Sequence, residues 1–137
     1  MSVTDREKWN SKYSGAETAP SKPSAVLVAL SPYLPTRGHA LDIAGGAGRN
    51  AIWLARRGLD VTIADISSVG LALARERAAA ANVKIQTTEL DLEQQPLPPG
   101  PYDLVLSNCY LCRHLFPHFS NDLTDDGRLV VIQPTKR

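Results

Sequence analysis

The chain has 137 residues, a length typical of one domain, and its 43% hydrophobic content is sufficient for a packed core. A formal net charge of +1 at pH 7 provides no strong field for nucleic acid or an anionic membrane, so neither is expected as a partner. The first residues are charged and lack the apolar core of a signal peptide, and no apolar run approaches the ~20 residues that span a bilayer. These features predict a cytoplasmic protein.

Two helices are predicted at the N-terminal end. Residues 5–14 form the first, and its Trp9 and Tyr13 lie four positions apart, so both rings face the same side. These rings either pack on the rest of the domain or contact a ligand. After a connection rich in proline and serine, residues 24–34 carry apolar side chains at helical spacing and form the second helix.

Strands and helices alternate along the rest of the chain. This order predicts an α/β fold: a doubly wound, Rossmann-like and mostly parallel sheet of about five strands, with helices on both faces. The chain is one domain, with N-terminal helices over residues 1–36 and the core over residues 37–137. Strands are predicted from His39 and over residues 60–65, 83–87, 102–108 and 128–133, with helices over 49–57, 69–81 and 111–119 and a turn at 125–127.

The centre of the chain is residues 39–50, HALDIAGGAGRN, in which an apolar strand with one acid leads into three glycines and a helix. Strand, glycine turn and helix form the nucleotide site of doubly wound proteins, because glycines let the backbone approach the ligand and the first helical N–H groups point toward it. Residues 46–51 also fit the dinucleotide pattern G-x-G-x-x-A. Asp42, however, would repel a pyrophosphate and suits a ligand with an ammonium or sulfonium charge; the alternative is an acid that interacts with the helix dipole.

Two further acids follow predicted strands. Asp65 ends the second strand, where a carboxylate can accept hydrogen bonds from ribose hydroxyls, and Ser67 is the natural cap of the next helix. Asp91 follows the third strand and is either a ligand acceptor or a turn acid. The carboxyl ends of neighbouring parallel strands meet at one edge of the sheet, so these acids and the glycine turn predict one site.

The two cysteines form the pair Cys109-x-x-Cys112, a spacing also found in redox pairs and zinc sites. The pair lies late in the chain, which disfavours a redox motif, and His114 and His118 follow too closely for a zinc finger. We interpret the cysteines as two partly buried thiols that line a loop, and we predict no metal site.

The motifs occur in the order of a known family. Residues 42–50, DIAGGAGRN, match the pattern D-x-[GA]-x-G-x-G-R-N, with Ala44 where a glycine is commoner. The sequence resembles the class I S-adenosylmethionine-dependent methyltransferases, most closely the small bacterial group related to tellurite-resistance and thiopurine methyltransferases. The further similar segments are 9–13 (WNSKY, a W-N-x-x-Y lid helix), 61–67, Asp91-Leu92, 102–105 with Asn108, and 127–130.

The resemblance implies S-adenosyl-L-methionine as the cofactor, a sheet in the order 3-2-1-4-5, and in-line methyl transfer to a small molecule. In the family, the second-strand acid binds both ribose hydroxyls, the Asp-Leu pair binds the adenine edge, and the lid helix closes over the methionine end. The implied cofactor-binding residues are Trp9, Tyr13, Asp42, Ala44, Gly45, Gly46, Gly48, Asn50, Asp65, Ile66, Asp91, Leu92 and Asn108.

No catalytic residue is assigned, because methyl transfer from a sulfonium needs a base only when the acceptor must lose a proton. The side chains expected near the methyl group have no fixed partner in the sequence. They are Asn108, Tyr110, Arg113, His114, His118 and Tyr13.

Typical members of the family continue past the fifth strand with a helix and an antiparallel pair of strands. No segment of this sequence matches these elements. The fifth strand is therefore expected at a sheet edge, where it could pair with a second copy in a dimer or with a partner chain. The alternative function is a non-catalytic S-adenosylmethionine-binding module or remnant that acts with a partner chain. A dinucleotide-binding protein of the NAD type is less favoured.

Overall fold

A computed structural model describes residues 6–8, 10–11, 22–91, 94–107 and 123–132, and the structural statements below concern these residues. Residues 6–8 and 10–11 are helical. The further elements are α2 (Ala25–Ala29), the 3₁₀ helix η2 (Ser31–Tyr33), β1 (His39–Ile43), α3 (Arg49–Arg56), β2 (Asp60–Asp65), α4 (Ser68–Ala80), β3 (Ile85–Glu89), β4 (Tyr102–Ser107) and β5 (Leu123–Val131).

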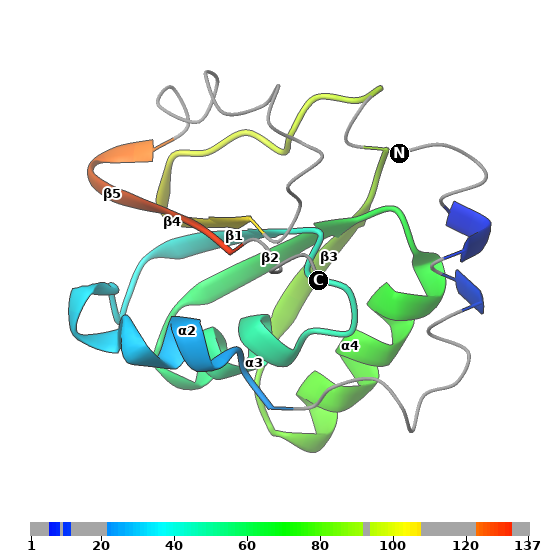
Figure 1. Ribbon diagram of the computed structural model, residues 1–137, viewed down its shortest axis with the longest axis horizontal. Coiled ribbons are helices and arrows are strands. Elements are labelled where there is room, and N and C mark those ends of the chain that lie inside the picture. Colours follow the sequence, from blue (N-terminus) through cyan, green and yellow to red (C-terminus); the bar gives the residue numbers. More distant parts are fainter. Residues whose placement is uncertain (1–5, 9, 12–21, 92–93, 108–122, 133–137) are drawn as a thin grey trace, which may run out of the picture.

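The strands form one parallel sheet in the order β3-β2-β1-β4-β5, which confirms the predicted fold class and strand order (Figure 1). β1 lies in the middle, with Asp42 opposite Ile63 of β2 and Leu106 of β4. The crossover connections place the carboxyl ends of β1, β2 and β3 at one edge, where ligands bind in open α/β sheets.

Helices α2, α3 and α4 cover one face of the sheet (Figure 1). Their buried side chains, including Leu27, Leu54 and Leu71, pack on alternate residues of the strands such as Val61 and Leu104. On the opposite face, Leu90 and Leu97 cover a second cluster of Leu41, Ile43, Ala64, Tyr102 and Val105. The helix predicted at residues 111–119 lies outside the described residues.

The predicted helix over residues 24–34 is shorter in the structure. α2 ends at Ala29, and η2 continues with Pro32 in its first turn. Proline has no N–H group and clashes with the carbonyl four residues earlier, so it begins the 3₁₀ turn instead of extending α2. Leu34 still reaches the core, whereas Val26 is 56% exposed.

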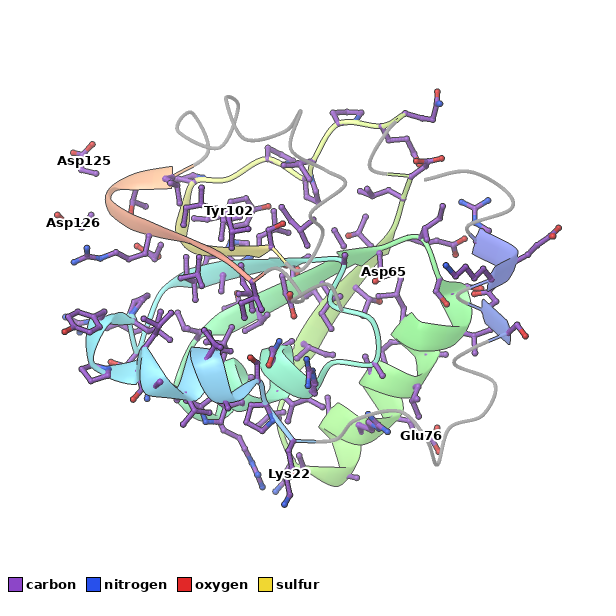
Figure 2. All side chains as sticks on the ribbon, in the orientation of Figure 1. Lys22, Asp65, Glu76, Tyr102, Asp125 and Asp126 are labelled. Carbon is purple, nitrogen blue, oxygen red and sulfur yellow. The ribbon has the colours of Figure 1, made fainter. Side chains whose placement is uncertain are left out.

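The predicted boundaries of β3 and β5 are also wrong. Val83 does not begin β3, because its N–H binds the carbonyl of Ala78 and closes the end of α4 beyond the left-handed Asn82. β5 begins at Leu123 and includes the predicted turn 125–127 as an irregularity opposite β4, where Tyr102 pairs with Leu123 and Leu104 with Arg128. Asp125 and Asp126 project away from the sheet there (Figure 2).

Two helix ends provide a matched test of backbone conformation. Gly58 closes α3 with φ +114°, and a Cβ at this position would clash with the Thr36 carbonyl oxygen. We expect Gly58→Ala to lower the free energy of unfolding by about 1–3 kcal/mol in urea titrations. Asn82→Gly is the control, because Asn82 also has a positive φ of 64° and glycine adopts it freely. An equal loss in both variants would contradict this explanation.

Candidate cofactor site

The turn between β1 and α3 has an unusual backbone conformation. Ala44, Gly46 and Gly48 have positive φ values of 59°, 57° and 87°. Glycine adopts this region without a steric cost, so the structure explains the glycines at two positions and makes Ala44 the strained one. A Cβ on Gly48 would lie 2.9 Å from the Cβ of Ala74, so this glycine also permits the close approach of α4. The turn therefore presents backbone rather than side chains.

Asp42 lies directly beneath this turn. The residue is 0% exposed, and a Cβ on Gly45 would lie 2.5 Å from its Oδ2 atom and 2.9 Å from Cγ2 of Ile63. The absence of a side chain at Gly45 therefore leaves the space that the carboxylate occupies. The structure places one buried acid under the backbone of the turn, at the position where the sequence predicts an acceptor for a cationic group.

Asp65 joins the glycine turn to the end of β2. Its Oδ2 accepts a hydrogen bond from the Gly46 N–H (2.9 Å), and its Oδ1 accepts one from the Ser67 N–H (2.9 Å). Burial raises the pKa of Asp65 above 3.8, although the backbone hydrogen bonds from Ser67, Gly46 and Ile66 act in the opposite direction. Figure 2 shows Asp65 near the beginning of α4. A carboxylate has about four acceptor positions, so Asp65 can accept further hydrogen bonds from a ligand.

The beginnings of α3 and α4 differ in their capping. Ser67 caps α4, as predicted, because its Oγ accepts a hydrogen bond from the Gly70 N–H (3.0 Å). α3 begins after Gly48 and has no side-chain cap hydrogen bond. The first N–H groups of α3 therefore face the turn without a capping side chain, which is the usual arrangement for an anionic part of a ligand.

Asn50 has a structural contact that the sequence did not predict. Its side chain is buried, and its Oδ1 accepts a hydrogen bond from the Ser24 N–H (2.8 Å). This bond attaches the residue before α2 to the first turn of α3. The cofactor-binding role of Asn50 stays a prediction, and it would have to involve the amide nitrogen or share this oxygen.

The end of β3 lies next to Asp65. Glu89 is in register with Asp65, and the Leu90 N–H donates to the Asp65 carbonyl oxygen (2.9 Å). Asp91 follows immediately and its carbonyl oxygen accepts from the N–H groups of Gln94 and Gln95. The structure therefore brings Asp42, Asp65 and Asp91 to the carboxyl ends of three adjacent strands.

The predicted site is only partly covered by the described residues. The glycine turn, Asp42, Asp65 and Ile66 come together, and Asp91 lies at the next strand end. Among the described residues, no group of three His, Cys, Asp or Glu side chains is placed to hold a metal, and no helix could cross a membrane. The predictions for Trp9, Tyr13, Leu92, Asn108, Cys109 and Cys112 concern residues outside the described part of the chain.

Sequence reasoning missed two residues beside this site. Arg6 donates from Nε to the carbonyl oxygen of Ile66 (3.3 Å), and Asn10 accepts from the Ser67 hydroxyl (2.6 Å). Asn10 belongs to the WNSKY segment, in which the sequence predicts ligand contacts only for the aromatic residues Trp9 and Tyr13. The partner of each residue lies about 60 positions away, as the sequence separations of 60 and 57 show, so no local pattern reveals these contacts.

Comparison with known proteins identifies relatives of this chain. Residues 40–124, well over half of the chain, match the family described as "Methyltransferase domain". An uncharacterized protein of Mycobacterium tuberculosis and another of Mycobacterium bovis are 38% identical over 69 residues, 50% of this chain and 25% of theirs. The match therefore spans about a quarter of the length of these curated relatives.

Solved structures agree on the fold. An S-adenosyl-L-methionine-dependent methyltransferase of Methanococcus maripaludis, described as putative in its published name, has a TM-score of 0.72 and 21% identity over 97% of this chain and 65% of its own. TehB from Haemophilus influenzae has a TM-score of 0.69 and 21% identity over 90% of this chain and 44% of its own. An S-adenosylmethionine-dependent methyltransferase of Mesorhizobium loti has a TM-score of 0.65 and 28% identity over 79% and 53%.

The sheet order, the turn after β1 and the sequence match give one consistent assignment. The chain belongs to the methyltransferase domain family and has the fold of the class I S-adenosylmethionine-dependent methyltransferases.

Proposed function

We propose that this chain binds S-adenosyl-L-methionine and promotes in-line transfer of its methyl group to a small-molecule acceptor. The observation that carries the proposal is the pair of buried carboxylates at the turn after β1: Asp42 lies beneath the turn, and Asp65 at the end of β2 accepts a hydrogen bond from the Gly46 N–H. S-adenosylmethionine is the cofactor of this family and fold. The acceptor and the activity itself are proposals.

The described residues suit the chemistry of this cofactor. Its ribose carries two hydroxyl donors, and the Asp65 carboxylate keeps acceptor positions beyond those used by Gly46 and Ser67. Its amino acid end carries an ammonium group, and the buried Asp42 lies directly under the turn. The NAD-type alternative ranks lower because a carboxylate at Asp42, directly under the turn, would repel a pyrophosphate, and because Asp91 follows the third strand as in the methyltransferases.

The family resemblance and this placement support the following roles for the chain's own residues. Asp65 would hold the ribose, Ile66 and Asp91 would border the adenine, and the backbone of Ala44, Gly45, Gly46 and Gly48 would line the amino acid end. When bound, the cofactor supplies the methyl group on its sulfonium, and the protein has mainly to orient the acceptor and exclude water. No base among the described residues is assigned. The roles of Trp9, Tyr13, Asn50, Leu92 and Asn108 stay predictions.

The alternative is a module that binds the cofactor without catalysis and acts with a partner chain. β5 lies at the edge of the described sheet, and its Leu129 is 39% exposed. This edge is where we predict pairing with a second copy or a partner. Cytoplasmic location and a small-molecule acceptor are likewise predictions from the sequence.

Cofactor identity is tested first by calorimetric titration with S-adenosylmethionine, S-adenosylhomocysteine and NAD. We expect saturable binding of the first two and at least about tenfold weaker binding of NAD, because the carboxylate of Asp42 under the turn would repel the pyrophosphate. Binding of NAD alone, or of none of the three, would refute the cofactor assignment. Formation of S-adenosylhomocysteine with a panel of thiols, amines, phenols and metalloid oxyanions then separates an enzyme from a binding module.

Asp65→Asn tests the ribose contact and its dependence on pH. Loss of a charged acceptor should weaken S-adenosylhomocysteine binding by about tenfold or more. Because the pKa of Asp65 is raised, protonation begins at a higher pH than for an ordinary aspartate, and the affinity of the unmodified protein should fall in that range as the pH is lowered.

The stability of the unliganded protein should change in the opposite direction. Between the ordinary pKa of 3.8 and the raised value, the folded state binds more protons than the unfolded state, so this group's contribution to the free energy of unfolding decreases as the pH rises. Asp60→Asn, at the exposed beginning of the same strand, is the matched control and should bind normally. If the affinity of Asp65→Asn for S-adenosylhomocysteine fell in the same way as the pH is lowered, a group other than Asp65 would be responsible for the pH dependence.

Gly45→Ala tests the space above Asp42. Its Cβ would lie 2.5 Å from the Asp42 Oδ2 atom, so the turn or the carboxylate must move. We expect a loss of about 1–3 kcal/mol in the free energy of unfolding and weaker cofactor binding. Ala44→Gly is the matched control, because it relieves a positive φ one residue earlier and should leave stability unchanged or increase it. A Gly45→Ala variant with normal stability and binding would disprove the close fit.

A further inference from the structure

The N-terminal helical residues contact the turn that follows β2. Arg6 Nε donates to the carbonyl oxygen of Ile66 (3.3 Å), and Asn10 Oδ1 accepts from the Ser67 hydroxyl (2.6 Å) and from the Val69 N–H (3.4 Å). Figure 1 shows these residues, in blue, beside the beginning of α4. The same turn contains the Ser67 N–H that donates to Asp65. The contacts therefore reach the proposed ribose acid through Ile66 and Ser67, the two residues that follow it.

Ser67 links Asn10 to Asp65 in a specific way. The serine is 0% exposed, and its hydroxyl has one hydrogen, which it donates to Asn10, while it accepts from the Gly70 N–H. Asn10 thus fixes the orientation of the hydroxyl that caps α4. The backbone N–H of the same serine fixes one oxygen of Asp65. Loss of the Asn10 acceptor would leave a buried hydroxyl to reorient, and the turn that holds Asp65 would no longer be fixed from this side.

Arg6 extends the contact to β3. Its Nε lies 3.6 Å from Glu89 Oε2 as well as 3.3 Å from the Ile66 carbonyl oxygen. Glu89 is in register with Asp65 and directly precedes Leu90 and Asp91. One guanidinium therefore spans the ends of the two strands to which the proposed function assigns the ribose and the adenine. The ion pair is partly exposed and weak by itself, so its significance is geometric.

We propose that Arg6 and Asn10 are positioning residues that hold the Asp65–Val69 turn in the conformation that binds the nucleoside part of the cofactor. The inference rests on the proposed function. Neither residue touches the ligand in this scheme; each acts through the turn. Because free-energy coupling is reciprocal, a bound nucleoside that orders the turn also strengthens the attachment of the N-terminal helical residues.

The test measures S-adenosylhomocysteine affinity by calorimetry in the full chain. We expect Asn10→Ala to weaken binding about fivefold or more. Asn10→Asp should bind S-adenosylhomocysteine with the affinity of the unmodified protein. Its carboxylate supplies the same acceptor beside the beginning of a helix, where negative charge is favoured. Arg6→Gln should weaken binding to a smaller extent. Glu7→Gln is the matched control, since Glu7 is an exposed residue of the same helical segment, and its affinity should be unchanged.

A double-mutant cycle separates positioning from a general structural role. If Asn10 acts through Asp65, Asn10→Ala should change affinity less than about twofold in the Asp65→Asn background. An undiminished effect in that background would overturn the proposal, as would normal affinity in Asn10→Ala or failure of Asn10→Asp to restore it. If Asn10→Ala does not fold, the cycle is run with Arg6→Gln, which should weaken binding in the otherwise unmodified protein but not in the Asp65→Asn background. Absence of binding by the unmodified protein would instead refute the proposed function.

Discussion

The hydrogen bond from the Gly46 N–H to the buried carboxylate of Asp65 is the contact on which the site depends. Parallel pairing of β1 with β2 brings the two strand ends to the same level, but it does not determine the path of the chain beyond them. The bond from Gly46 fixes the path of the glycine turn. The other oxygen of Asp65 fixes the turn before α4 by accepting a hydrogen bond from the Ser67 N–H. A single carboxylate therefore sets the positions of both turns that border the proposed nucleoside site.

The same arrangement makes the unliganded site electrostatically unfavourable. Asp65 is 5% exposed and Asp42 is 0% exposed, and desolvation raises the pKa of Asp65 despite its backbone donors. A ligand that brings hydroxyl donors to Asp65 and a positive charge near Asp42 offsets part of this penalty. For that reason, ligand binding should stabilise this part of the fold more than the buried apolar area of the ligand alone would suggest.

Several features of the fold could be predicted because their causes are local. The buried run 60–65 gives β2 its observed bounds, and Ser67 and Gly58 mark helix ends by their own chemistry. The start of β3 was mispredicted because Val83 has strand propensity but is used to close α4. The location of Asp65 at the candidate site could be predicted because the residue ends a strand. The contacts of Asn50, Arg6 and Asn10 could not, because their partners lie far away in the sequence.

The two helix beginnings at this edge give the site a direction. At α4 the Gly70 N–H is taken by Ser67 and the Val69 N–H points to Asn10, so the protein itself supplies the acceptors. At α3 the N-cap residue is Gly48, which has no side chain to cap the helix. An anionic group is therefore favoured at α3, and hydroxyl donors are favoured at Asp65. For the proposed cofactor, we therefore expect the amino acid end over the glycine turn, the ribose toward β2 and the adenine at β3.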